Sequence, residues 1–314
     1  MSVPTVVALG GNAISPAGGA GTAAEQTENL HRTMMQVAEL VEAGLDRLVV
    51  THGNGPQVGN VLIKNELARD VVPPVPLDWC VAQTQATIGF TIADTLGYEL
   101  ERRGIERPVV PVVSRVRVEL DDPAWDEPSK PIGPYLDDAD EVARRQALGQ
   151  AYTQVPDRGW RRVVPSPEPR ESLDREAVQL LLDDGAIVVA NGGGGIPVVA
   201  GVDEPLRGVE AVIDKDLAGA RLAEELGAGT FVILTDVAGV AIGYGTDEER
   251  WLEEVAVSEL RDHQAAGHFR AGSMGPKVEA ACRFVERTSG RSVIADLNRA
   301  REAVDGHTGT RVRP

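Results

Sequence analysis

Short apolar runs alternate along the chain with segments whose apolar residues recur at helical spacing. Runs rich in β-branched residues predict strands at Val6–Leu9, Leu48–Thr51, Val109–Val113, Ala186–Ala190, Phe231–Thr235 and Ser292–Ala295. Helical spacing predicts helices over Thr27–Ala43, Leu77–Leu100, Arg175–Asp184, Asp216–Glu225 and Pro276–Glu286, with a final helix to about Ala303. This alternation indicates an α/β fold, with an open, mainly parallel sheet covered by helices in two lobes that join near residue 210.

The pattern changes between about Ser114 and Arg170. Prolines, acidic pairs and tryptophans cluster there, as in Asp122-Pro123-Ala124-Trp125. We interpret the segment as an excursion from the main sheet, forming a small flap of short strands. A long surface loop is the alternative, and loops of that length without secondary structure are uncommon in compact domains.

Three predicted strands end in glycine-rich turns. These turns are Gly10-Gly11-Asn12, Gly53-Asn54-Gly55 and Asn191 to Gly195, the last including Gly193 and Gly194. Because the carboxyl ends of parallel strands meet at one edge of a sheet, the turns are expected to lie together. A glycine there lets backbone N–H groups approach an anion, although a single such turn often does no more than reverse the chain. Neither a GxxxxGK[ST] loop nor a GxGxxG turn that opens a helix is present.

Lysine is rare in this chain, and most of the basic side chains are arginines. Lys277 follows Ser273-Met274-Gly275-Pro276 at a predicted helix start, where free N–H groups and the helix dipole attract phosphate. Lys215 and Asp216 also precede a helix, and the alternative there is an acidic cap with a neighbouring ion pair. Lys130 lies between prolines, which present its side chain in a fixed direction or simply form a rigid exposed turn. Lys64 is interpreted as a solvated residue.

Charge and composition exclude several classes of function. The formal net charge of −17 argues against nucleic-acid binding, and no apolar run is long enough to span a membrane. The isolated cysteines Cys80 and Cys282 are expected to be reduced, as in a cytoplasmic protein. The histidines show no metal-ligand spacing, and His52 is expected to be a hydrogen-bonded structural residue. No GxSxG motif indicates a serine hydrolase.

These segments together resemble the carbamate kinases, within the amino acid kinase family. The resemblance covers nearly the whole chain and rests on runs that occur in the family's order. They are Ala8 to Ala13, Thr51 to Gly59, Lys130 to Gly133, Asn191 to Pro197, Val212 to Asp216, Gly272 to Met274, and Pro276-Lys277.

The resemblance implies a three-layer αβα fold with a small protruding subdomain at about 114–170. It implies an N-terminal lobe, 1–210, for carbamate or carbamoyl phosphate, and a C-terminal lobe, 211–314, for ATP or ADP with Mg²⁺. It further implies a homodimer that exchanges a phosphoryl group between ATP and carbamate, used to make ATP from carbamoyl phosphate.

The resemblance also assigns roles to individual residues. Lys215 and Lys277 would contact the transferred phosphoryl group, Asp216 would orient them, and Lys130 would reach in from the subdomain. The predicted phosphate-binding residues are Gly10, Gly11, Asn12, Gly53, Asn54, Gly55, Gly193 and Gly194. The predicted nucleotide-binding residues are Asp236, Tyr244, Met274 and Pro276.

One segment departs from the family's pattern. Thr84-Gln85-Ala86 stands where the family often has Ser-Gln-Gly, and the added methyl group bears on the substrate or on the dimer contact. Two alternatives therefore stay open. One is a family kinase that phosphorylates another small carboxylate or phosphate acceptor, and the other is a nucleotide-binding regulator without turnover.

Overall fold

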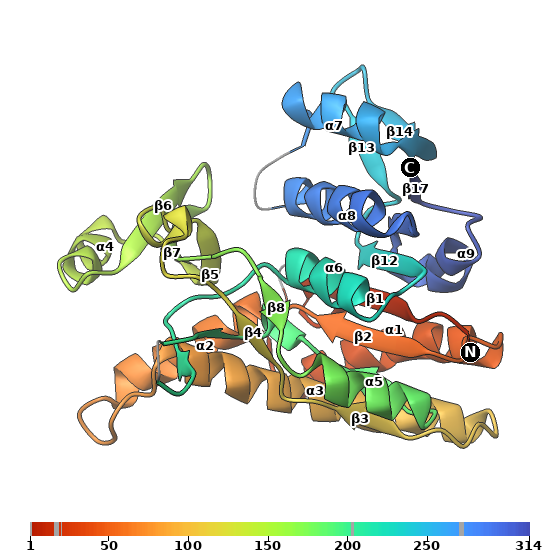
Figure 1. Ribbon diagram of the computed structural model, residues 1–314. Helices are drawn as coiled ribbons and strands as arrows, with labels where there is room; N and C mark the ends of the chain where they lie inside the picture. Colours follow the sequence, from red (N-terminus) through yellow and green to blue (C-terminus); the bar gives the residue numbers. More distant parts are fainter. Residues whose placement is uncertain (1, 16–18, 20, 202–203, 270–272) are drawn as a thin grey trace.

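The computed structural model describes residues 2–15, 19, 21–201, 204–269 and 273–314. Within them an eight-stranded sheet runs through the molecule (Figure 1). Its spatial order is β15 (Glu254–Ala256), β17 (Thr310–Arg313), β16 (Arg291–Asp296), β12 (Thr230–Thr235), β1 (Thr5–Leu9), β2 (Leu48–His52), β9 (Ile187–Val189) and β3 (Val109–Pro111). All neighbours pair in parallel except β16 with β17. The open, mainly parallel sheet predicted from the sequence is confirmed.

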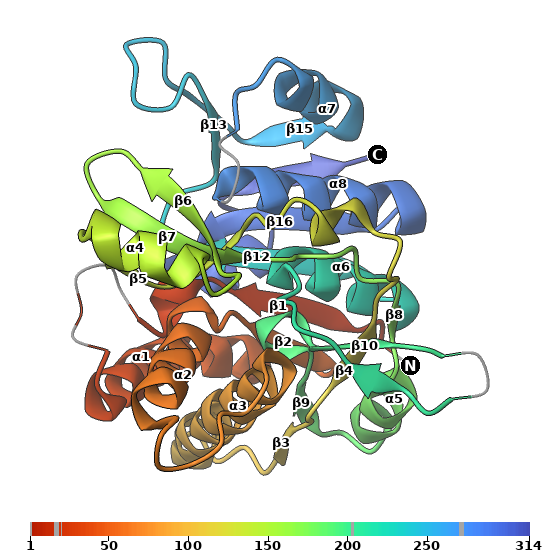
Figure 2. The same ribbon diagram turned by 90° about the vertical axis from the view of Figure 1, so that its left-hand side faces the viewer.

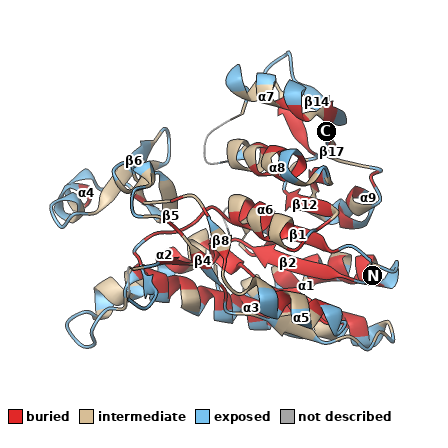
Figure 3. Ribbon diagram, viewed as in Figure 1, coloured by how far each residue is buried: buried red, intermediate tan, exposed pale blue. Residues whose placement is uncertain are grey.

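Helices cover both faces of this sheet, which gives three layers. One face packs on α1 (Ala23–Glu42), α3 (Leu77–Arg102) and α9 (Ala300–Val304). The other packs on α5 (Arg175–Asp183), α6 (Lys215–Glu225), α7 (Val257–Ala265) and α8 (Met274–Thr288). Residues 5–9 of β1 are all buried, in keeping with the continuous apolar run Val6–Leu9 (Figure 3).

The halves of the sheet come from successive parts of the chain. One half of the sheet consists of β3, β9, β2 and β1, which all precede residue 210 in the chain. The other half consists of β12, β16, β17 and β15, which all follow it. The two halves meet where β1 pairs with β12, from Thr5 opposite Thr230 to Leu9 opposite Leu234. The assignment of a different substrate to each half stays a prediction.

The protruding subdomain is smaller than the excursion expected from the sequence. It comprises residues 130–164, which form β5 (Lys130–Leu136), α4 (Ala139–Gln146), β6 (Ala151–Val155) and β7 (Gly159–Val164). The strands form an antiparallel sheet in the order β5-β7-β6, which extends from the main body in Figures 1 and 2.

The ends of the expected excursion belong to a second sheet on the main body. This four-stranded sheet has the order β11 (Arg207–Gly208), β10 (Ile196–Val199), β4 (Arg115–Arg117) and β8 (Glu171–Ser172). The two short strands β4 and β8 therefore return the chain to the body on either side of the subdomain.

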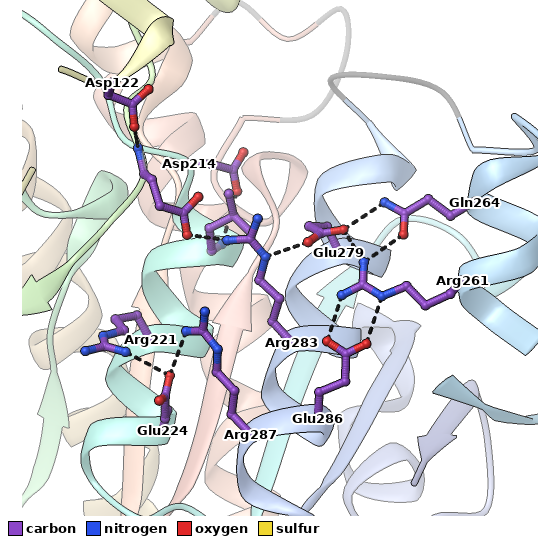
Figure 4. A network of polar contacts seen from close by, with 12 residues as sticks. Asp122, Asp214, Arg221, Glu224, Arg261, Gln264, Glu279, Arg283, Glu286 and Arg287 are labelled. Atoms are coloured by element: carbon purple, nitrogen blue, oxygen red, sulfur yellow. Dashed lines mark hydrogen bonds and ion pairs between the residues drawn. The ribbon is translucent and has the colours of Figure 1, made fainter. Parts of the chain in front are cut away.

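An ion-pair network ties α7 to α8 on the outer layer (Figure 4). The Arg261 guanidinium donates to both oxygens of Glu286, at 2.9 Å each, and also pairs with Glu279. Arg283 pairs with Glu279 as well, and through Glu168 it joins α8 to the segment that follows the subdomain. The network uses arginines throughout, in keeping with the scarcity of lysine.

Among the described residues, no helix is long and apolar enough to cross a membrane. Cys80 and Cys282 are free thiols and both are buried, as the sequence predicted.

Candidate active site

The glycine-rich turns meet at the carboxyl edge of the main sheet. Leu9 at the end of β1 pairs with His52 at the end of β2, so their turns start side by side. A Cβ atom added to Gly53 would lie 3.8 Å from Cα of Gly11. A Cβ atom on Gly193 would lie 2.2 Å from the side-chain nitrogen of Asn54. The buried Asn54 side chain lies so close to Gly193, whose φ is +65°, that there is no room for a side chain at Gly193.

Two amides of these turns hold the turns to neighbouring strands. The Gly10 N–H donates to the carbonyl oxygen of Leu234 at 2.9 Å, and the Gly53 N–H donates to that of Leu9 at 3.3 Å. Both amides are thus already used inside the protein. Asn54 is likewise internal, because it is buried and its amide donates to Thr84 at 2.9 Å.

One carboxylate gathers two of the predicted lysines. Asp216 lies in the first turn of α6 and pairs with the neighbouring Lys215 Nζ and, at 3.3 Å, with Lys277 Nζ from the first turn of α8. Asp216 is 2 % exposed and Lys215 9 %. The sequence left open whether Lys215 belonged to a simple helix cap, and the structure places it in a buried charge cluster.

The Lys215 side chain also touches the second glycine turn. A Cβ atom at Gly53 would stand 3.2 Å from Cδ of Lys215. Burial lowers the pKa of Lys215, the Asp216 carboxylate counteracts this, and the charge of Lys277 lowers the pKa further. The cluster therefore concentrates positive charge at this edge although the protein as a whole is strongly acidic.

Asp214 has a double role, of which the sequence reasoning considered only the acidic cap. As the cap of α6, its Oδ1 accepts hydrogen bonds from the N–H groups of Asp216 at 2.8 Å and Leu217 at 3.2 Å. Its Oδ2 accepts one from Lys130 Nζ at 2.6 Å. Burial alone would raise the pKa of Asp214, but the charge and hydrogen bond of Lys130, with Lys215 nearby, hold it well below its usual value. Only the capping role has a local sequence signal.

A cavity of about 490 Å³ opens beside the cluster. The predicted residues that line it are Gly10, Gly11, Asn12, Asp236 and Lys277. Asn12 donates to Asp236 at 2.6 Å, which joins the ends of β1 and β12 across the seam of the sheet.

The other side of this cavity is formed by residues that the sequence did not single out. They include Asn29, Arg32 and Gln36 of α1 and Asn298 after β16. Polar positions on an amphipathic helix look like a solvated face in a sequence, so nothing local distinguishes these from other surface residues.

His52 takes no part in the charge cluster. It is 1 % exposed, and its Nδ1 lies 2.9 Å from the carbonyl oxygen of Gly53, so that nitrogen carries the proton and donates. Burial lowers the pKa of His52 to about 4, with a smaller contribution from the charge of Lys215. The residue is neutral near pH 7, in agreement with the structural role predicted for it.

The remaining predicted nucleotide residues lie at the start of α8 and on a hairpin. Met274 and Pro276 open α8, whereas Gly272 of the same motif lies outside the described residues. Tyr244 follows β13 (Val240–Ile242) and precedes β14 (Arg250–Leu252). It is 52 % exposed, and its ring packs edge-on against Trp251 with centroids 6.2 Å apart. None of these three lines the cavity described above.

The segment that departs from the family pattern divides between two surroundings. The Thr84 hydroxyl accepts from Asn54, and the Gln85 amide exchanges two hydrogen bonds with the Ser114 backbone, at 2.8 and 3.1 Å. Ala86 is exposed on the outer face of α3. Its extra methyl group therefore lies on the surface of the protein and not against the glycine turns.

A magnesium ion would have to come largely with its own ligands. Across the described residues, no group of three or more histidine, cysteine or acidic side chains is arranged to hold a metal ion. The carboxylate at the cavity wall, Asp236, accepts from Asn12 and from the Thr235 hydroxyl at 3.1 Å. Oxygen donors of this kind suit a magnesium ion that keeps several waters and phosphate ligands.

Comparison with known proteins places this chain in a family. The model of the amino acid kinase family matches residues 4–296. The chain belongs to the amino acid kinase family.

Particular relatives extend over the full length of the chain. A carbamate kinase from Thermococcus kodakarensis is 50 % identical over 311 residues, which cover 98 % of each chain. One from Halobacterium salinarum is 43 % identical over 310 residues, covering 99 % of this chain and 98 % of that one. The solved structure of a carbamate kinase from Giardia lamblia bound to AMP-PNP superimposes with a TM-score of 0.91 at 36 % identity, and covers 99 % of this chain and 98 % of its own.

Proposed function

We propose that this chain is a carbamate kinase, which transfers a phosphoryl group reversibly between ATP and carbamate. The observation that carries the proposal is the pair of ammonium groups of Lys215 and Lys277 on the single buried carboxylate of Asp216. The family membership and the names of the full-length relatives support it further.

The surroundings of the cluster suit an acceptor that is already an anion. A hydroxyl acceptor would need a general base. His52 is not suited to that role, because it is buried and its Nδ1–H donates to the Gly53 carbonyl oxygen. A carbamate oxygen needs no base to attack the γ-phosphorus. The new oxygen–phosphorus bond forms as the bond from that phosphorus to the leaving oxygen of ADP breaks. Catalysis is then positioning and charge compensation.

In this proposal the glycine turns and the lysines donate hydrogen bonds to the phosphate groups. Gly11 and Asn12 line the cavity, and Gly55 begins α2 (Gly55–Ala68), so we assign phosphate binding to the N–H groups of these three residues. A helix start of this kind favours an anion. Lys215 and Lys277 would compensate the charge that spreads over the moving phosphoryl group.

The nucleotide is assigned to the C-terminal half of the sheet. Asp236, Tyr244, Met274 and Pro276 would surround it, and Asp236, which lines the cavity, would share a magnesium ion through water. The ion would neutralise charge on the nucleotide phosphates.

The test is ATP formation from carbamoyl phosphate, ADP and Mg²⁺ by the purified protein. Lys277→Ala and Lys215→Ala are each expected to lower kcat by about 10²–10³, the usual cost of removing one group that stabilises the transition state. Lys64→Ala is the matched control, because Lys64 is exposed on α2. A turnover within a few-fold of the parent in both cluster variants contradicts the assignment. If the protein is active only with another carboxylate or phosphate acceptor, that acceptor and not carbamate is its substrate.

The proposal includes a homodimer in the cytoplasm. Three large side chains, Trp79, Phe90 and Tyr98, are 61 %, 55 % and 52 % exposed on one face of α3, next to the exposed Ala86. Apolar exposure of this kind is typical of an interface. Phe90→Glu is expected to give monomers in analytical ultracentrifugation, whereas Leu67→Glu, at an 81 % exposed position on α2, leaves the dimer intact. A monomeric parent, or a dimeric Phe90→Glu variant, argues against this face.

The two cysteines support the assignment to the cytoplasm. Both are buried free thiols, and thiols are kept reduced in the cytoplasm.

A further inference from the structure

Lys130 reaches the charge cluster from the first residue of the protruding subdomain. Its Nζ lies 2.6 Å from Asp214 Oδ2, and residues 130–164 form a layer of their own beside the main body. Any displacement of the subdomain therefore changes the distance between this ammonium group and the cap of α6. What fixes the subdomain on the body also fixes Lys130.

The backbones of α2 and β5 touch at two glycines. A Cβ atom on Gly59 would lie 2.0 Å from Cα of Gly133 and 2.3 Å from its nitrogen. Gly133 has φ +68° and stands three residues after Lys130. The Gly133 carbonyl oxygen also accepts a hydrogen bond from Arg161 on β7, at 3.1 Å. At these two glycines α2 and β5 are so close that no side chain fits between them.

Two turns further along α2, Glu66 holds three separate parts of the subdomain. Residues seven apart share one face of a helix, so Glu66 extends the contact that Gly59 begins. One carboxylate oxygen accepts from Arg145 on α4 at 2.6 Å. The other accepts from Gln150 at 3.1 Å and lies 3.7 Å from the guanidinium of Arg162 on β7. All three charged side chains are less than one-third exposed.

We propose that Glu66 is a positioning residue for phosphoryl transfer, which clamps the subdomain onto α2 so that Lys130 is held at Asp214. The inference rests on the proposed function for its kinetic consequence. The same helix starts at Gly55, in the second glycine turn, so α2 connects the clamp directly to the predicted phosphate-binding edge. The Glu66 carboxylate touches no reacting group and acts only through Lys130.

A double-mutant cycle with Glu66→Ala and Lys130→Ala tests this. Glu66→Ala is expected to lower kcat for ATP synthesis about 10-fold with little change in the KM for ADP, because a mutation far from the chemistry costs rate when it misplaces a group at the site, here Lys130. In the Lys130→Ala background the same change is expected to cost less than about 2-fold, because the group that it positions is gone. An unchanged kcat, or an equal loss in both backgrounds, overturns the proposal.

Glu254→Ala is the matched control. Glu254 also pairs with two arginines, Arg311 at 3.5 Å and Arg313 at 3.1 Å, but at the far edge of the main sheet. It is expected to leave kcat unchanged. If Glu66→Ala does not fold, Glu66→Gln keeps the shape and removes the charge, and the same cycle is run with it.

Hydrogen exchange gives a readout that does not depend on turnover. Loss of the Glu66 carboxylate is expected to speed exchange of the β5 and β7 amides, residues 130–136 and 159–164, and to leave the buried β1 amides unchanged. A parent that makes no ATP would refute the proposed function while this comparison still decides on the clamp. Unchanged exchange in β5 and β7 refutes the clamp itself.

Discussion

Asp216→Asn is the substitution that tests the charge cluster most directly. It keeps the shape of the side chain and removes the charge that pairs with Lys215 and, at 3.3 Å, with Lys277. Because Asp216 is 2 % exposed, water cannot replace the lost carboxylate. Removing one partner of a buried ion pair typically costs about 3–5 kcal/mol. We expect the lower part of that range, because the lysine side chains are 11 % and 15 % exposed and asparagine still offers an oxygen.

The variant should also change how Lys215 binds its proton. In the parent, burial lowers the pKa of Lys215 and the Asp216 carboxylate raises it. Without the carboxylate the pKa falls further, so Lys215 loses its proton at a lower pH. Relative to the parent, the loss of stability is largest at pH values where Lys215 is protonated in both folded proteins. It shrinks as the pH rises through the pKa of Lys215 in the folded parent, which burial has already lowered below 10.5, because Lys215 is then neutral in both folded proteins. The alkaline limb of the rate profile moves to lower pH.

The scarcity of lysine makes the measurement practical. Only Lys64, Lys130, Lys215 and Lys277 contribute to a spectrum of isotopically labelled lysine side chains, and single variants assign each signal. The titration of Lys215 is followed in parent and variant together with ATP synthesis. Asp174→Asn, which removes a partner of Arg115 away from the cluster, is the control. A Lys215 that titrates at the same or a higher pH in the variant would refute the electrostatic reasoning.

Three further predictions concern other parts of the molecule. Because folding lowers the pKa of His52 from 6.5 to about 4, the unfolding free energy should drop by about 3 kcal/mol as the pH falls between these values. Urea titrations at several pH values should show that the unfolding free energy of His52→Gln depends less on pH than that of the parent. Glu279→Ala should lower the unfolding free energy by about 1–2 kcal/mol, because Arg261 loses one of its carboxylate partners; equal urea midpoints would contradict this. Tyr244→Ala should raise the KM for ADP about 2- to 10-fold if the ring stacks on the nucleotide, whereas Tyr244→Phe should not.

The sequence predicted the inner strands of the main sheet well because these strands are buried on both sides. Continuous apolar runs such as Val6–Leu9 are unambiguous, and the turns after them carry glycine where backbones touch. The start of α1 was missed by four residues, because the apolar spacing only begins at Leu30. A local signal did exist. The Thr22 hydroxyl accepts a hydrogen bond from the Glu25 N–H, and the Glu25 carboxylate accepts one from the Gly21 N–H.

What the sequence did not predict depends on contacts between distant segments. Strands β13 to β15 and β17 are only three or four residues long, too short to establish a period, and helix α7 was missed with them. The attachment of Lys130 to Asp214 joins residues 84 positions apart, and neither has a neighbour that reveals the other. The clamp at Glu66 is of the same kind. Charged residues on a helix predict a solvated face unless the partner segment is known.

The seam where β1 pairs with β12 makes the two halves of the molecule mutually dependent. β1 is the innermost strand of its half, and removal of residues beyond 210 would leave its apolar edge, Val6 to Leu9, without a partner. An uncovered edge of this kind recruits other chains. The halves should therefore melt in a single calorimetric transition, and a gene split at this point should yield fragments that are insoluble alone and recovered only by co-expression.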